Sequence, residues 1–108
     1  MTSDSINIKA ELILYSTKNG GRQNGIKTGY RPNHVFEYNN GINFKAAYMG
    51  KIVFEENYIL ELNESKIVKV EFVSGQNIDK YLEVGKTWWI HEGGRKVGEA
   101  EIMEILNE

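Results

Sequence analysis

The stretch from Lys18 to Pro32, KNGGRQNGIKTGYRP, holds glycines, an arginine and a Lys-Thr pair in the order of a phosphate-binding loop. That motif needs a lysine directly after its second glycine, so that the amine reaches the outer phosphates. Here Ile26 separates Gly25 from Lys27, and Gly-Tyr-Arg-Pro follows where a helix should begin. Spacing and context favour a glycine-rich connection between two strands, and we expect this chain to bind no nucleotide.

Residues that could support catalysis are few. The chain has no cysteine, which excludes a disulfide, a thiolate metal site and a cysteine nucleophile. Neither His34 nor His91 belongs to a His-x-x-x-His or His-x-Glu pattern of the kind that zinc sites use. The acids Glu99, Glu101 and Glu104 have the spacing of a solvated strand face or a strand edge. We therefore expect two structural histidines and no enzyme activity, metal or cofactor.

Two paired motifs suggest binding instead. Trp88 and Trp89 are adjacent, and neighbouring side chains of a strand point to opposite faces. One indole should enter the core, and the other should meet solvent, a loop or a partner. The tripeptide Gly-Gly-Arg occurs twice, ending at Arg22 and Arg95. These arginines could form an anion-binding surface with nearby backbone N–H groups, or each could brace its loop by bonding carbonyls or a glutamate.

The elements that must position these residues are strands. Apolar and polar residues alternate from Ile6 to Leu14, which predicts a strand. The last run contains good helix formers, but Gly98 and the alternation of Ala100 and Ile102 with glutamates favour a strand there too. Further runs rich in aromatic and β-branched residues lie at 34–38, 44–55, 65–74, 86–92 and 95–106, with a weaker candidate at 58–63. About six strands with glycine-rich corners predict an all-β barrel or sandwich.

The composition is that of one globular domain. A chain of 108 residues removes roughly two-thirds of its unfolded surface from water, and 41% hydrophobic with 26% charged residues is typical of such domains. The absence of cysteine fits the reducing cytosol, so we expect a cytoplasmic protein. No stretch approaches the ~20 apolar residues that span a bilayer, so we expect no membrane segment. A net charge of -2 repels phosphate backbones at long range. Nucleic-acid contact would need a local basic patch, built from Arg22, Lys27, Arg31 and Arg95.

Three segments, AELILYSTKNGGRQN, GYRPN and HEGGRKVGEAEIMEIL, resemble the third, C-terminal β-barrel domain of elongation factor Tu. In that family a strand leads into a GGRH loop, a GYRPQFYF strand follows, and a REGGRTVGAGVV strand closes the domain. The resemblance covers about Ile8 to Leu106 in the same order, although residues 40–80 match by strand pattern alone. It implies that residues 1–108 form one six-stranded antiparallel closed β-barrel whose role is binding.

The resemblance also implies partners. In the full factor this domain packs on the GTPase domain, contacts the T-stem backbone of aminoacyl-tRNA and meets the nucleotide-exchange factor. Carried over by motif, the RNA-facing residues are Arg22, Asn33 at the glutamine of YRPQ, and Glu92 with Gly93 in the closing strand. The candidate residues for binding RNA or a protein partner are Arg22, Gln23, Arg31, Asn33, His91, Glu92, Gly93 and Arg95.

Several positions depart from the family pattern. Gln23 replaces the histidine of the first loop, and His91 replaces the arginine before the closing motif. The threonine-rich TTDVTG turn is shortened to NNG, and a segment with Gln76 and Asn77 enlarges the loop where the family places a lysine near tRNA. The barrel corners are therefore retained while the RNA contacts are thinned.

These observations lead to two hypotheses. Nothing in the sequence resembles a GTP-binding or second barrel domain, so we expect neither GTP hydrolysis nor tRNA delivery by this chain alone. We expect a stand-alone paralogue of the third domain, acting as a non-catalytic module that contacts tRNA or a protein of the translation machinery. The alternative is a decoy or immunity-type protein that mimics the elongation factor surface to bind a toxin or regulator.

Overall fold

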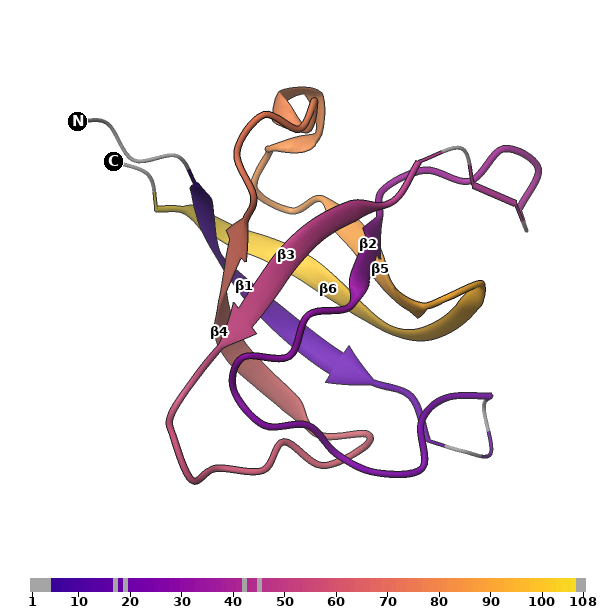
Figure 1. Ribbon diagram of the computed structural model, residues 1–108, viewed down its shortest axis with the longest axis vertical. Coiled ribbons are helices and arrows are strands. Elements are labelled where there is room, and N and C mark those ends of the chain that lie inside the picture. The colour runs from indigo at the N-terminus through magenta and orange to yellow at the C-terminus, as the bar shows by residue number, and fades with distance from the viewer. Residues whose placement is uncertain (1–4, 17, 19, 42, 45, 107–108) are drawn as a thin grey trace.

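Strand pairing in the computed structural model closes the chain into a barrel (Figure 1). The strands are β1 (Ile6–Leu14), β2 (Asn33–Val35), β3 (Tyr48–Val53), β4 (Ser65–Phe72), β5 (Thr87–Glu92) and β6 (Arg95–Ile105). Their hydrogen-bonded order is β1-β4-β3-β2-β5-β6, β6 pairs back to β1, and each of these pairs is antiparallel. The structure describes residues 5–16, 18, 20–41, 43–44 and 46–106. The predicted all-β class and closed six-stranded barrel are confirmed.

Alternation of apolar and polar residues fills the barrel, because a closed sheet has one inner face and side chains change face at each residue. On β1 the inward residues are fully buried, whereas Lys9 and Glu11 between them are exposed. The strands contribute to the interior Ile8, Ala10, Leu12, Leu14, Ile52, Val68, Val70, Phe72, Trp88, Ile90, Ala100 and Ile102. The same rule separates the two tryptophans, since Trp88 is fully buried and Trp89 on the outer face is half-buried.

The strand limits differ most from the sequence expectation in three places. β2 ends at Val35 rather than at residue 38, and β3 begins at Tyr48 rather than at residue 44. Residues 58–63 form no strand: Leu60 makes one bridge to Ile26, and this segment lies between turns. The C-terminal run is a strand, as expected, because β1 and β5 pair with its two edges.

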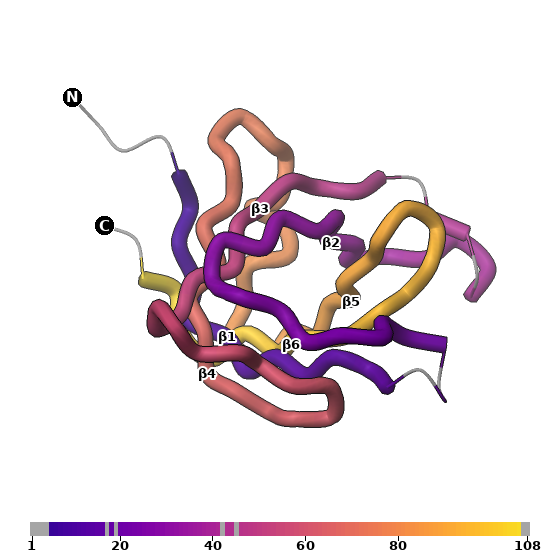
Figure 2. Tube along the Cα trace, turned by 60° about the horizontal axis from the view of Figure 1, so that its bottom comes forward, coloured from indigo at the N-terminus to yellow at the C-terminus, as the bar shows by residue number. Residues whose placement is uncertain are grey.

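The glycine-rich connection after β1 is a packed loop. In Figure 2 its purple segment runs beside the connection between β3 and β4. Ile26 and Leu60 exchange two backbone hydrogen bonds of 3.0 and 2.9 Å across this contact. A Cβ atom at Gly21 would lie 2.1 Å from the carbonyl oxygen of Tyr15, so this position requires glycine. The first Gly-Gly-Arg motif thus allows the chain to turn closely against the end of β1.

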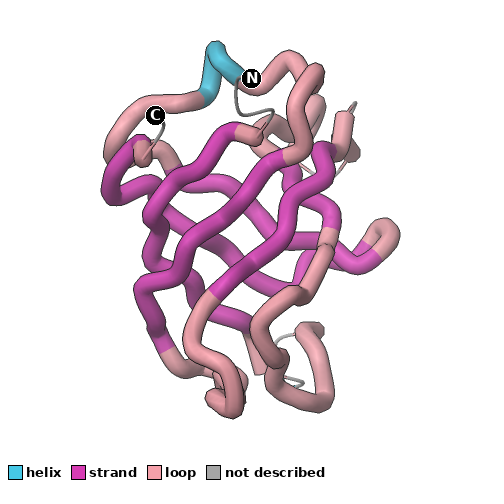
Figure 3. Tube along the Cα trace, turned by 60° about the vertical axis from the view of Figure 1, so that its left-hand side comes forward, coloured by secondary structure: helices cyan, strands magenta, loops and turns pink. Residues whose placement is uncertain are grey.

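Gln76 completes the sheet where β3 and β4 begin to separate. Its side-chain Oε1 accepts a hydrogen bond from the Met49 amide at 2.7 Å. Its Nε2 donates to the carbonyl oxygens of Met49 and Val73 at 2.9 and 2.8 Å. The side-chain amide therefore takes the place of a peptide group between the two strands. The loop continues into a single 3-10 turn, η2 (Asp79–Tyr81), at one end of the barrel (Figure 3).

Within the residues described above, no helix is long and apolar enough to cross a bilayer.

His34 of β2 and Trp88 of β5 meet in the middle of the barrel. The indole N–H of Trp88 donates to His34 Nδ1 at 2.9 Å. Because Nδ1 accepts, Nε2 carries the proton of the neutral ring and donates to the carbonyl oxygen of Gly50 at 3.1 Å. His34 is therefore a satisfied structural histidine, as expected. Burial lowers its pKa to about 4, although the Gly50 carbonyl acts in the opposite direction.

The first prediction concerns stability against pH. The unfolded chain protonates His34 near its ordinary pKa, whereas the folded chain holds this ring neutral down to about pH 4. Between these values the unfolded state binds more protons, so stability should fall as the pH falls, by about 3 kcal/mol from this group. Urea unfolding at several pH values between 7.5 and 4 measures the effect.

A glutamine variant isolates the contribution of this ring. His34→Gln keeps an acceptor for the indole N–H and does not titrate, so its stability should depend less on pH over the same interval. His91→Gln is the matched control, because His91 is also buried but lies outside the barrel interior, and it should retain most of the dependence. Equal pH dependence in the wild type and in His34→Gln would contradict the assignment.

Candidate functional site

Four of the eight predicted residues meet at one hollow. Arg22 and Gln23 come from the connection after β1, Glu92 ends β5, and Arg95 begins β6. Together with Asn24 they line a hollow of about 270 Å³, which we call the arginine hollow. Gly93, with φ at 62°, makes the tight turn between Glu92 and Arg95 and is exposed. The two Gly-Gly-Arg motifs, far apart in sequence, therefore lie together in the fold.

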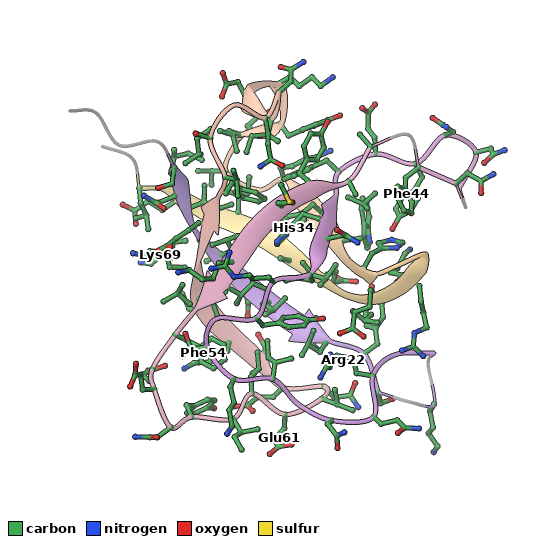
Figure 4. The ribbon with its side chains drawn as sticks, in the orientation of Figure 1. Arg22, His34, Phe44, Phe54, Glu61 and Lys69 are labelled. Carbon is green, nitrogen blue, oxygen red and sulfur yellow. The ribbon has the colours of Figure 1, made fainter. Side chains whose placement is uncertain are left out.

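The Arg22 side chain is held by the protein itself. Its guanidinium forms an ion pair with Glu92 and donates from Nε to the carbonyl oxygen of Asn24 at 2.9 Å. A longer bond of 3.3 Å joins it to the carbonyl oxygen of Gly25, and its Cζ atom lies 5.1 Å from the centre of the Tyr30 ring. Figure 4 labels Arg22 among these loops. Of the two roles open from the sequence, Arg22 braces its loop.

Sequence reasoning missed Tyr30 as well as Asn24 at this site. The Tyr30 hydroxyl donates to the same carboxylate oxygen of Glu92 that pairs with Arg22. Burial raises the pKa of Tyr30 above its ordinary value, and the neighbouring carboxylate of Glu92 adds to this shift. The tyrosine therefore stays protonated and donates throughout the neutral range. The one sequence signal that could have identified Tyr30 as a site residue was its position directly before Arg31 in the Gly-Tyr-Arg-Pro motif.

Arg95 presents the more accessible positive charge of the hollow. Its side chain is 60% exposed, against 22% for Arg22, and its nearest nitrogen lies 3.8 Å from Glu92. Gln23 beside it is also exposed. Two guanidinium groups face one carboxylate here, which leaves the hollow with a net positive charge. An anionic group could approach Arg95 and Gln23 without displacing the bonds that Arg22 makes.

Arg31 and Asn33 lie at a different place. They line a hollow of about 160 Å³ together with Pro32, Met49, Gly50 and Val73. Arg31 is exposed, and Asn33 is half-buried on β2. In the register of β2 and β5, Asn33 lies opposite His91. This pairing connects the hollow to the segment that leads into the second Gly-Gly-Arg motif. The structure therefore divides the predicted set into two groups rather than joining it into one site.

His91 is covered by the connection between β2 and β3. The ring is 2% exposed, shares a hydrogen bond of 2.5 Å with the Tyr38 hydroxyl and lies 4.9 Å from the Phe44 ring, edge to face. Lys96 lies over the Tyr38 ring at 4.8 Å. Desolvation lowers the pKa of His91, as does the charge of Lys96. This cover leaves the His91 ring inaccessible to a partner.

The second nitrogen of His91 has no hydrogen bond to any described residue. The backbone of Gly93 and Gly94 lies near the ring and favours its protonated form, without the geometry of a hydrogen bond. The pKa stays below its ordinary value because desolvation outweighs this effect. The expectation of a satisfied histidine therefore holds for one nitrogen of His91 and not for the other.

No protein-family model matches this sequence. Among the described residues, no group of three or more histidines, aspartates and glutamates could hold a metal ion.

The second prediction concerns the bracing role of Arg22. Arg22→Ala removes an ion pair and two bonds to loop carbonyls, so the free energy of unfolding should fall by about 1 to 2 kcal/mol. Arg95→Ala, whose side chain is largely exposed, should change it by less than about 0.5 kcal/mol. Urea unfolding of both variants gives the comparison. Equal losses in the two variants would show that Arg22 does not brace the loop.

Proposed function

We propose that this protein is a non-catalytic, cytoplasmic barrel that binds a component of the translation machinery through the arginine hollow, and that tRNA is this component. The observation that carries the proposal is the meeting of the two Gly-Gly-Arg motifs at one hollow. The same motifs carry the resemblance to the third domain of elongation factor Tu. A phosphate or ribose could approach closely at the exposed turn of Gly93 and Gly94, where no side chain stands in the way.

The charges at the hollow set the expected strength of binding. Glu92 neutralises much of the charge of Arg22, so Arg95 is the main cation available to a phosphate. The net charge of the chain is -2, which opposes approach of an RNA backbone. Binding should therefore be weak, should rest on about one phosphate contact, and should decline with salt.

The environment of the histidines supports a non-catalytic role. Both ring nitrogens of His34 are bonded inside the barrel, and His91 lies beneath Tyr38 and Phe44. Neither ring is hydrogen-bonded to a carboxylate of the described residues. A general acid or base needs contact with its substrate and a partner that tunes its pKa, and neither histidine has this arrangement here.

A decoy or immunity-type protein is the second candidate. It is favoured by the internal bonding of Arg22, because the residue that the resemblance assigns to RNA is engaged by Glu92 and two carbonyls. On such a surface the barrel corners of the family are retained, while Arg22 is bonded within the protein. This surface would suit a protein partner that recognises the shape of the barrel end. Such a partner would bind with little dependence on salt.

The third prediction tests the choice of partner. Fluorescence anisotropy of labelled tRNA at low salt should show binding, and Arg95→Ala should weaken it and reduce the salt slope by about one. Lys69→Ala on the outer face of β4 is the matched control and should bind as the wild type does. The nucleotide-exchange factor is titrated in parallel. If neither tRNA nor the exchange factor binds, the translation role is wrong and the decoy role remains.

A further inference from the structure

A third hollow, of about 260 Å³, lies between η2 and the connection that follows β2. Its lining comes from three segments: the connection between β2 and β3, the first residue of β3, and η2. The lining residues are Glu37, Asn39, Ala46, Tyr48, Lys80 and Tyr81. None of these six belongs to the arginine hollow, so this is a separate place on the barrel, which we call the tyrosine hollow.

The aromatic wall of the tyrosine hollow is fixed to the core. The Tyr81 ring stacks on Phe36 with centroids 4.7 Å apart and planes 5° from parallel. Tyr48 meets Tyr81 edge to face at 6.1 Å and meets Phe36 in the same manner at 5.9 Å. Phe36 is 1% exposed and itself packs on Trp88 at 5.3 Å. The wall is therefore rigid before any ligand arrives, which reduces the entropy lost on binding.

Charges of opposite sign border this wall without neutralising each other. Glu37 accepts a hydrogen bond of 2.6 Å from the Tyr81 hydroxyl through Oε1. Lys80 Nζ lies 5.2 Å from the centre of the Tyr81 ring, and Lys86 Nζ, from outside the lining, lies 5.6 Å from the same centre. Neither Glu37 nor Lys80 forms an ion pair with the other or with any other described residue. The hollow thus offers a carboxylate oxygen and an ammonium group beside the same tyrosine ring.

This combination selects a class of ligand. A simple anion that reaches Lys80 also meets the charge of Glu37, and a simple cation has the opposite difficulty. A small molecule that carries both an ammonium and a carboxylate satisfies both groups at once. An apolar side chain on the same molecule would cover the tyrosine rings and remove their surface from water.

We propose that the tyrosine hollow binds a free α-amino acid with an apolar side chain. Its ammonium group lies against Glu37, its carboxylate against Lys80, and its side chain against Tyr48 and Tyr81. The amide of Asn39, which makes no side-chain hydrogen bond to the described residues, is available to the same backbone atoms. Both charged groups of the protein are exposed, so the dissociation constant should be on the order of 1 mM.

The experiment compares three probes on the wild-type chain. L-Phenylalanine carries both charges, N-acetyl-L-phenylalanine lacks the ammonium, and L-phenylalaninamide lacks the carboxylate. Titration followed by ¹H–¹⁵N NMR should show saturable shifts at residues of the tyrosine hollow with phenylalanine. Each analogue should bind about fivefold more weakly, the loss that corresponds to one exposed charge contact.

Two variants assign the charges. Glu37→Gln keeps an acceptor for the Tyr81 hydroxyl, and it should weaken phenylalanine binding about fivefold without weakening that of the N-acetyl analogue, whose carboxylate the charge of Glu37 opposes. Lys80→Met should also weaken phenylalanine binding about fivefold, without weakening that of phenylalaninamide, whose ammonium group the charge of Lys80 opposes. Glu83→Gln and Lys69→Met lie outside the lining and should bind as the wild type does.

Three outcomes would overturn the proposal. The first is an absence of shifts with phenylalanine at about 10 mM, well above the expected dissociation constant. The second is equal binding of all three probes, which would mean that the protein does not recognise the ammonium and carboxylate groups of the ligand. The third is equal loss in the lining variants and the control variants. Each of these leaves the arginine hollow and its RNA titration unaffected, because no residue is shared.

Discussion

A buried indole N–H group at the centre of the barrel must have an acceptor, and His34 provides it. The ring joins three strands at one point, since it lies on β2, accepts from Trp88 on β5 and donates to Gly50 on β3. β2 has only three residues and so can form few ladder hydrogen bonds with its neighbours. The side-chain bonds of His34 supplement them, and the closure of the barrel at this strand depends on a neutral imidazole.

The position of β5 also determines how the loop beside its end is held. Glu92 is the last residue of this strand, and its carboxylate receives both the Arg22 guanidinium and the Tyr30 hydroxyl. One acid thus holds the connection after β1 at two points, on either side of the contact between Ile26 and Leu60. The arginine hollow is therefore organised around a carboxylate, and its cation at the rim is Arg95.

Alternation along the chain was sufficient to predict most of the barrel, because the inner face of a closed sheet selects apolar residues at every second position. It overextended β2 and β3, where apolar residues such as Phe36 are buried by stacking on Trp88 and Tyr81 rather than by strand pairing. The repeated Gly-Gly-Arg motif raised two possible roles for Arg22, an anion-binding surface or a brace to carbonyls or a glutamate, but it did not identify Glu92 as the partner. The cover over His91 was not predictable, since Tyr38 and Phe44 reach it from far away in sequence.

The short length of β2 also bears on how the barrel opens. Amide protons in long ladders such as β1–β4 and β1–β6 exchange with solvent only when a large part of the sheet unfolds. At β2 two or three register pairs on each side must break, so this strand is where a sub-global opening requires the least energy. Detachment of β2 would uncover Trp88, and in a chain with Trp89→Phe the fluorescence of this indole would then report the motion.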